Sequence, residues 1–245
     1  MYYFIRDSMN TKIVGKFFQS ETIAWNYGNI DNPRLLNNIY FEKIDFNPIV
    51  PIPILHKKAK ITDLISCVNA TSSGQLIISE QLKNIISKYR TDGLQFFTTS
   101  IIKDNLEYNN FYALNMYKFN NDYIDFTKSV IIHNRKADDY KSSFMTVEEQ
   151  INFENFQQFD EKRIQVWSSR EEIILIEKLK LHIENIKEDF FMIKYVFGGT
   201  LFVSDKLKKE IEDAGCTGIE FQPIELSYNE WTAPGGERER VYGKA

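Results

Sequence analysis

The sequence is poor in the residues that most often build metal and nucleophile sites. Its 245 residues include two cysteines, Cys67 and Cys216, and three histidines, His56, His133 and His182. The cysteines form no CxxC pair, and no histidine lies in an HExxH motif or at metal-ligand spacing from a cysteine or carboxylate. We therefore predict no metal site, and two reduced, unlinked cysteines of the kind found in a reducing cytosol.

Long apolar runs are also absent. No stretch approaches the roughly 20 residues that span a bilayer, and Arg6 and Asp7 follow too short an apolar start for a signal peptide. The net charge of −4 gives no electrostatic footprint for nucleic acid. A hydrophobic content of 43% supplies ample core material and excludes disorder. These features predict a folded cytoplasmic protein whose partners are neither membranes nor nucleic acids.

Catalytic motifs are missing as well. The chain contains no GxSxG and no GxGxxG, and Gly198-Gly199 lead into an apolar run rather than a helix N-terminus, so they indicate a turn and not a phosphate loop. Neighbouring carboxylates such as Glu148-Glu149 point apart within a regular element. We predict no catalytic residue, no cofactor-binding residue and no cofactor, and hence no enzymatic activity.

What the chain does contain is a repeat. "LIISEQLKNIISKYRTDGLQF" (76–96) is followed 125 residues later by "LFVSDKLKKEIEDAGCTGIEF" (201–221), and eight of the 23 positions aligned from Gly74 and Gly199 are identical. At ordinary residue frequencies about one or two identities are expected. Each copy has an apolar run, a serine suited to cap a helix, an amphipathic pattern, and a glycine before a second apolar run. The repeat predicts an α+β fold with mixed sheets and two related strand–helix–strand units, at about 76–98 and 201–223.

Convergence of unrelated units on serine caps and glycine turns is the alternative explanation. Duplication is favoured because the copies also share Lys83 with Lys208 and Phe96 with Phe221, which capping does not require. If the units are equivalent, six apolar side chains should be buried. They are Leu82, Ile86, Phe96, Leu207, Ile211 and Phe221.

The remaining sequence suggests three regions within one compact domain. Residues 1–70 hold N-terminal strands and a proline-rich connector, 71–224 hold the repeat, and 225–245 form a loose tail rich in glycine and charge. Further elements are predicted from local periodicity and proline positions. They are strands at 2–5, 38–46, 163–167 and 178–186, a helix at 60–68, an extended connector at 47–55, and a hairpin formed by 109–119 and 123–132.

The two copies, joined by "FYALNMYKF" and "YIDFTKS", resemble a large group of bacterial polymorphic-toxin immunity proteins. The families concerned are the eleventh and the forty-third in the usual immunity numbering, and the similarity covers roughly Leu76 to Ile224. The resemblance implies a non-enzymatic cytoplasmic protein that binds a cognate toxin domain and neutralises it by occlusion. It transfers no functional residue and leaves the oligomeric state open. Two other functions remain possible from the residues alone. One is an enzyme of unrecognised type with a site of Asp, Glu, Tyr and Asn, and the other is a general protein-binding scaffold.

The segment from Asp138 to Glu161 is the candidate partner-binding surface. It is acidic and lacks a clear period, as expected of an exposed excursion, and loops commonly carry function. We predict that Asp138, Asp139, Glu148 and Glu149 contact the toxin, with nearby aromatic side chains as anchors. Those anchors are Tyr140, Phe144, Phe153, Phe156 and Phe159. The alternative is that the phenylalanines cover the core and the acids merely solvate a loop.

Overall fold

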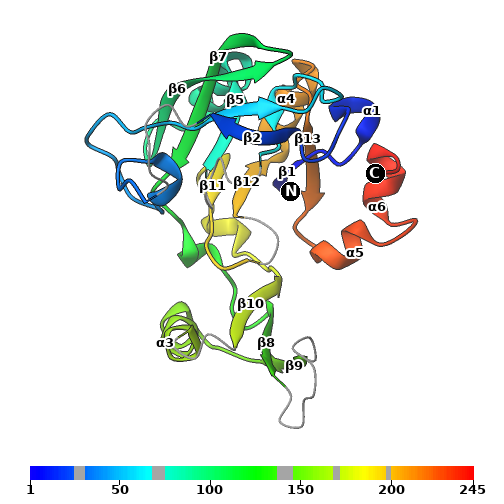
Figure 1. Cartoon of the computed structure of the whole chain (residues 1–245). Coiled ribbons are helices and arrows are strands. Elements are labelled where there is room, and N and C mark those ends of the chain that lie inside the picture. Colours follow the sequence, from blue (N-terminus) through cyan, green and yellow to red (C-terminus); the bar gives the residue numbers. More distant parts are fainter. Residues whose placement is uncertain (25–30, 68–74, 137–145, 168–171, 197–199) are drawn as a thin grey trace.

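A computed structural model describes residues 1–24, 31–67, 75–136, 146–167, 172–196 and 200–245 (Figure 1). The strands are β1 Tyr2–Asp7, β2 Ser20–Ala24, β3 Ile52–Leu55, β4 Leu64–Ile65, β5 Gln75–Ser79, β6 Leu94–Lys103, β7 Leu106–Met116, β8 Val130–Lys136, β9 Thr146–Ile151, β10 Ile173–Lys178, β11 Phe190–Met192, β12 Leu201–Ser204 and β13 Ile219–Pro223. The helices are α1 Thr11–Val14, α2 Glu80–Tyr89, α3 Phe156–Trp167, α4 Asp205–Asp213, α5 Tyr228–Thr232 and α6 Glu237–Tyr242. The strands form mixed sheets in the orders β2-β3-β6-β7-β5-β4, β11-β12-β1-β13 and β10-β8-β9, which confirms the α+β prediction.

The first copy of the repeat forms β5, α2 and β6. The helix begins at Ser79, whose side chain accepts a hydrogen bond from the Leu82 N–H at 3.2 Å. It is followed by Gly93, whose φ of +81° lets the chain turn back into β6. Strand β7 then lies between β5 and β6 and is antiparallel to both, and β4 pairs with the other edge of β5. We call β4-β5-α2-β6 together with β7 the first unit.

The second copy repeats this arrangement with β11, β12, α4 and β13. Ser204 caps α4 through the Leu207 N–H, again at 3.2 Å, and Gly218 has a φ of +82°. The central strand between β12 and β13 is β1, from the N-terminus of the chain, and it is antiparallel to both. We call β11-β12-α4-β13 together with β1 the second unit. Both units therefore have the same strand order, and the predicted pair of equivalent strand–helix–strand units is confirmed.

Each unit begins earlier than the sequence similarity does. The Ser79 hydroxyl donates to the Asp63 carboxylate at 2.6 Å, and the Ser79 N–H donates to the Asp63 carbonyl at 2.8 Å. Ser204 makes the same two bonds to Asp189 at the same distances. In both units an aspartate at the start of the first strand thus orients the serine that caps the helix.

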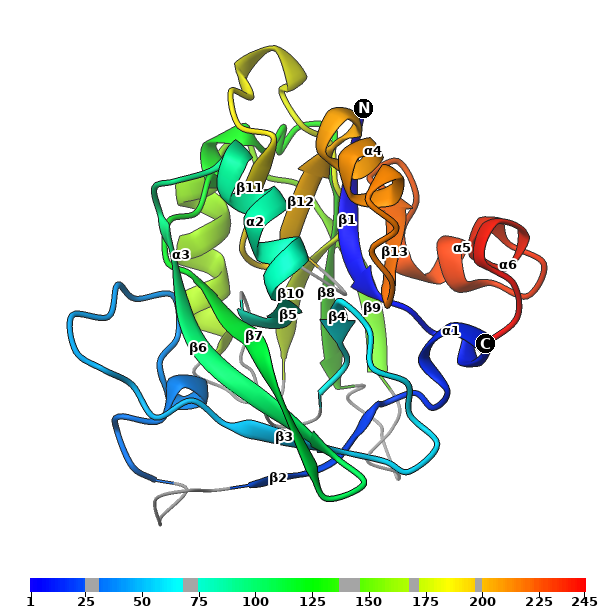
Figure 2. The same cartoon turned by 90° about the horizontal axis from the view of Figure 1, so that it is seen from above.

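The two units share one hydrophobic core, to which both helices contribute. Helices α2 and α4 lie side by side, as Figure 2 shows, and the Tyr89 hydroxyl donates to the Glu210 carboxylate between them. Five of the six predicted side chains are buried in this core, namely Leu82, Ile86, Leu207, Ile211 and Phe221. Burial of each such side chain contributes about 1.5–3 kcal/mol. Phe96 packs against the core but is only partly buried, so this part of the prediction is wrong.

The opposite faces of the two units are covered by different parts of the chain. In the first unit, Ile77 packs with Leu36, Leu55 and other residues of segment 36–59. In the second, Phe202 packs in a cluster with residues of α3 and of the sheet β10-β8-β9. This sheet and α3 lie at the end of the molecule opposite β6 and β7 (Figure 1). A shared core with two different coverings explains why the copies alone retain recognisable similarity.

Several predictions outside the repeat are wrong because tertiary pairing overrides local pattern. Segment 38–46 does not form a strand, since a short 3-10 helix ends at Asn38 and irregular chain follows. Within 60–68, Leu64 and Ile65 pair with β5 and form β4 instead of a helix. The predicted hairpin of 109–119 and 123–132 is absent, because β7 pairs with β5 and β6 whereas β8 pairs with β9 and β10.

The region after β9 differs from prediction in the same way. Residues 163–167 form the end of α3 and not a strand, with Phe159 and Val166 turned to the core at helical spacing. The predicted strand at 178–186 ends at its first residue, and a 3-10 helix follows at 183–185. No helix of the described residues is long and apolar enough to cross a membrane.

The predicted loose tail at 225–245 is instead ordered. Ser227 and Glu230 form a capping box that begins α5, and Trp231 on this helix is 1% exposed. Arg238 on α6 is 4% exposed. The charged composition suggested a solvated segment, but Arg238 and Trp231 are buried.

Candidate functional site

Within the described residues, the cysteines and carboxylates do not assemble into a recognisable reactive centre. Among the described residues no group of three or more histidine, cysteine, aspartate or glutamate side chains could hold a metal ion. Both cysteines are free. Burial raises the pKa of Cys67, and it raises the pKa of Cys216 to about 12. Both thiols therefore stay protonated at neutral pH, where a thiolate would be needed for nucleophilic chemistry.

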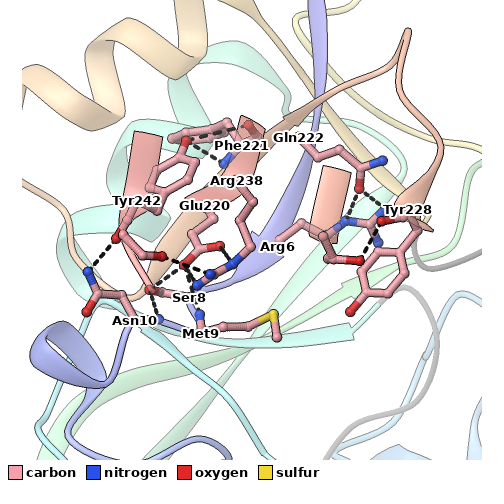
Figure 3. Close-up of polar contacts among 12 residues, drawn as sticks. Arg6, Ser8, Met9, Asn10, Glu220, Phe221, Gln222, Tyr228, Arg238 and Tyr242 are labelled. Carbon is pink, nitrogen blue, oxygen red and sulfur yellow. Dashed lines mark hydrogen bonds and ion pairs between the residues drawn. The ribbon is translucent and has the colours of Figure 1, made fainter. Parts of the chain in front are cut away.

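A buried polar cluster lies between β1, β13 and α6 (Figure 3). The Glu220 side chain is fully buried and accepts hydrogen bonds from the Ser8 hydroxyl and the Met9 N–H at 2.9 Å and from Arg238 at 2.8 Å. A second contact joins Arg238 Nε to the other Glu220 oxygen at 2.8 Å. Buried charges of this kind require such partners. The cluster fixes α6 to the second unit, which is a structural role.

Arg6 extends the same cluster along β1. Its guanidinium donates to the Gln222 side-chain oxygen at 2.6 and 2.9 Å and lies over the rings of Phe4 and Tyr228. Burial lowers the pKa of Arg6 to about 10, so the group remains a cation at neutral pH. Burial also raises the pKa of the neighbouring Asp7 to about 6. These contacts hold β1 in the centre of its sheet.

The predicted partner-binding residues are only partly within the described chain. Asp138 and Asp139, with the predicted anchors Tyr140 and Phe144, lie outside the described residues. Glu148 and Glu149 are exposed on β9, an edge strand of the sheet β10-β8-β9.

Glu148 and Glu149 project from opposite faces of this sheet. Ile131 and Ile151 pair on its core side, and Glu149 lies two residues from Ile151, so it shares that face with its partner His133. Glu148 projects from the other face, opposite Asn134. His133 also contacts Glu172 at 2.6 Å, which places another carboxylate beside Glu149. The acidic character of β9 is therefore divided between two faces.

The three predicted aromatic anchors within the described residues follow the alternative interpretation instead. Phe159 is fully buried, with ring contacts to Phe126, Phe153 and Tyr195. Phe153 and Phe156 are partly buried against the same cluster. The prediction of a surface anchor at Phe159 is wrong, because the helical period of α3 turns this residue inward.

Two hollows lined by described residues are open to a ligand or partner. One, of about 520 Å³, is lined by Asn121, Asp125, Lys128 and His182, among others. Its most acidic group, Asp125, already binds the Thr127 hydroxyl and the Lys128 ammonium, and these contacts lower its pKa to about 2. This group is therefore engaged in closing a turn.

The other hollow is a groove of about 940 Å³ between β6 and the proline-containing segment 47–52. Its lining includes the five consecutive residues Phe96 to Ser100, together with Asn32, Arg34, Glu107 and Asn109. Beside it the β6–β7 hairpin extends past β2 and β3 (Figure 2) and ends in a two-residue turn at Asp104-Asn105, both with positive φ. No residue pattern predicts this groove, because Phe96 to Ser100 have the sequence of an ordinary strand.

Comparison with known proteins identifies the chain's class. Residues 41–226 match the model of the "Immunity protein family (Imm11)", which places the chain among the immunity proteins. Specifically, it belongs to the Imm11 family. This is the eleventh immunity family, one of the two that the sequence resembles. No curated protein matches. The matched range omits β1 and most of the C-terminal segment, although both complete the second unit.

Proposed function

We propose that this protein binds a cognate polymorphic toxin domain in the cytoplasm and neutralises it by occlusion, without an enzymatic step of its own. The observation that carries the proposal is the Imm11 match, which covers residues 41–226 and supports a role in toxin immunity. An inhibitor of this kind must reach the toxin before the toxin's substrate does, so its association rate matters as much as its affinity.

Electrostatic steering would supply that speed if the active site of the toxin is basic. We propose that Asp138, Asp139, Glu148 and Glu149 form the acidic surface concerned. Support comes from the exposure of Glu148 and Glu149 on β9 and from the position of this sheet at one end of the molecule (Figure 1). These two side chains project from opposite faces of the sheet, so they do not form one flat patch. They would contact the toxin from both sides of strand β9 if this edge strand enters the active site of the toxin.

The test uses the toxin domain encoded beside this gene. Co-expression with wild-type protein should restore growth, and the purified partners should form a complex. Replacing Glu148 and Glu149 by lysine should slow association at low salt, with a smaller effect at high salt because ions screen the interaction. The matched control replaces Glu212 and Asp213, two adjacent exposed acids on α4, and should leave the rate unchanged.

Failure of the wild-type protein to bind the toxin or to restore growth would overturn the proposed function. An equal effect of both charge reversals, or no effect of either, would overturn only the assignment of the surface. Thermal unfolding of each variant establishes that the comparison is between folded proteins.

A further inference from the structure

The third strand of each unit has one edge that faces away from the central strand. In an antiparallel pair, alternate residues direct their N–H and C=O groups to the partner, and the intervening residues direct theirs outward. In the second unit the Phe221 N–H donates to the Tyr242 hydroxyl at 2.8 Å, so Phe221 is one of the outward residues. Two residues later the outward position is Pro223, which has no N–H. This edge of β13 is closed by an α6 side chain and a proline.

The first unit has Phe96 and Thr98 at the equivalent positions of β6, since Phe96 corresponds to Phe221 in the repeat. The neighbouring strand β3 pairs with β6 only at Ile54 and Ile102. At the N-terminal end of β6, the Gln95 side chain accepts a hydrogen bond from the Ile44 N–H at 2.9 Å and donates one to the Ile44 carbonyl at 2.6 Å.

Between these two points the outer edge of β6 is open. In the described part of the chain, the backbone of residues 96–100 bonds to no backbone other than that of β7. Phe96 and Thr98 therefore present unpaired donors and acceptors at the positions that the second unit protects. An edge of this kind is a template for another strand unless charge, proline or a covering element blocks it.

This open edge faces the groove of about 940 Å³. The opposite wall does not compete for it, because the Ile49 N–H donates to the Arg34 carbonyl at 2.8 Å and the Ile49 carbonyl accepts from Leu36 at 3.0 Å. Pro48 and Pro51 in the same wall have no N–H to donate. One side chain bridges the groove, since the Thr99 hydroxyl donates to the Pro51 carbonyl at 3.2 Å. Among the described residues, however, the wall offers no backbone partner to the outward groups of Phe96 and Thr98.

We propose that this groove receives an extended segment of the toxin, which pairs with the edge of β6 at residues 96–100. The inference rests on the proposed function and names the contact through which binding occurs. Addition of a strand to a sheet edge is an established mode of peptide recognition, in which backbone hydrogen bonds supply affinity. Five residues in extended conformation span about 17 Å.

Charge indicates one further property of the bound segment. Glu107 lines the groove but accepts the Ser100 hydroxyl at 2.6 Å. The exposed Arg34 uses Nη2 to bind the Asn47 carbonyl at 2.7 Å, and a guanidinium has five N–H donors in total. The segment therefore carries a carboxylate that reaches Arg34.

The test combines binding with amide exchange, using full-length protein and the purified toxin domain encoded beside it. Thr98→Pro copies Pro223 and should raise Kd at least tenfold. A double variant, Asn47→Trp with Thr98→Trp, fills the groove from two exposed positions and should also raise Kd at least tenfold. Thr22→Trp, at an exposed position on β2, is the matched control and should leave Kd unchanged. Amides of residues 96–100 that exchange rapidly in the free protein should exchange at least tenfold more slowly in the complex.

Three results would overturn the inference. If the toxin binds and cells are protected while residues 96–100 remain unprotected and the groove-filling variant binds normally, the groove is not the contact, and the proposed function stands. If the wild-type protein does not bind the toxin, both proposals fail together. If residues 96–100 become protected without toxin as the protein dimerises at higher concentration, the edge pairs with a second copy of this chain. The exchange measurement on wild-type protein remains decisive if Thr98→Pro fails to fold.

Discussion

The two units have the same strand order and the same helix cap, but the outer edges of their third strands differ. In the second unit Glu220 binds Arg238 of α6, and Phe221 is 5% exposed and donates its N–H to Tyr242 of the same helix. In the first unit Gln95 binds Ile44, and Phe96 remains partly exposed beside a groove. Local sequence thus determines the helix and its cap, whereas the state of the edge depends on what the rest of the chain places beside it.

The largest expected effect concerns the buried charge that closes the second edge. Glu220→Gln leaves the Arg238 guanidinium buried without its counter-charge and should lower the free energy of unfolding by about 3–5 kcal/mol. In the first unit, Gln95→Ala leaves two backbone groups of Ile44 without partners and should cost about 1–3 kcal/mol. Urea unfolding of both variants measures the difference. Equal losses would contradict the claim that the two edges are held by different chemistry.

The next comparison concerns the hydroxyl that covers the β13 edge. Tyr242→Phe removes the acceptor for the Phe221 N–H and should cost about 1–2 kcal/mol. The amide of Phe221 should then exchange as rapidly as that of Phe96. Tyr40→Phe, at an exposed tyrosine, is the control and should change neither quantity. An unchanged exchange rate at Phe221 in the Tyr242 variant would show that another group protects this edge.

The helix caps should behave alike in the two units. Ser79→Ala and Ser204→Ala should each cost about 0.5–2 kcal/mol, with values that agree within about 0.5 kcal/mol. Their aspartate partners should not behave alike, because Asp63 also accepts the Thr217 N–H at 2.8 Å. Asp63→Asn should therefore cost more than Asp189→Asn. Thermal and urea unfolding of the four variants would contradict this account if the two aspartates proved equivalent.

The most gradual expected effect concerns pH. Asp7 on β1 pairs with Ile219, whereas the equivalent position on β7 is the buried Met116, which pairs with Leu94. Burial raises the pKa of Asp7 to about 6, so the folded state binds this proton more tightly than the unfolded chain does. Stability should fall by about 1 kcal/mol for each pH unit as pH rises from about 4 to about 6. Asp7→Asn should remove this contribution, and an identical pH profile for the variant would contradict it.

The sequence was sufficient for features that depend on neighbouring residues. Serine caps, helical periodicity and the glycine turns predicted both strand–helix–strand units, and the preserved identities linked them. The same reasoning failed where partners are distant. Nothing in Tyr2–Asp7 indicates that β1 enters the second unit, because Asp7 at the end of β1 and Leu201 at the start of β12 are 194 residues apart in the sequence.

The functional surfaces show the same limit. The charge pattern predicted Glu148 and Glu149 as exposed acids, but their division between two faces follows from the pairing of Ile131 with Ile151. The groove beside β6 could not be predicted, because it lies where no described strand pairs with the outer edge of residues 96–100. Only the comparison with β13, where Tyr242 and Pro223 occupy the equivalent edge, makes the open edge recognisable.

The most direct measurement is residue-resolved amide exchange at Phe96, Thr98 and Phe221, in the free protein and in its complex with the toxin domain. We expect slow exchange at Phe221 in both states, and exchange at Phe96 and Thr98 that is fast in the free protein and slow in the complex. Exchange at Phe96 and Thr98 that is already as slow as at Phe221 in the free protein, or that stays fast when the toxin is bound, would contradict it.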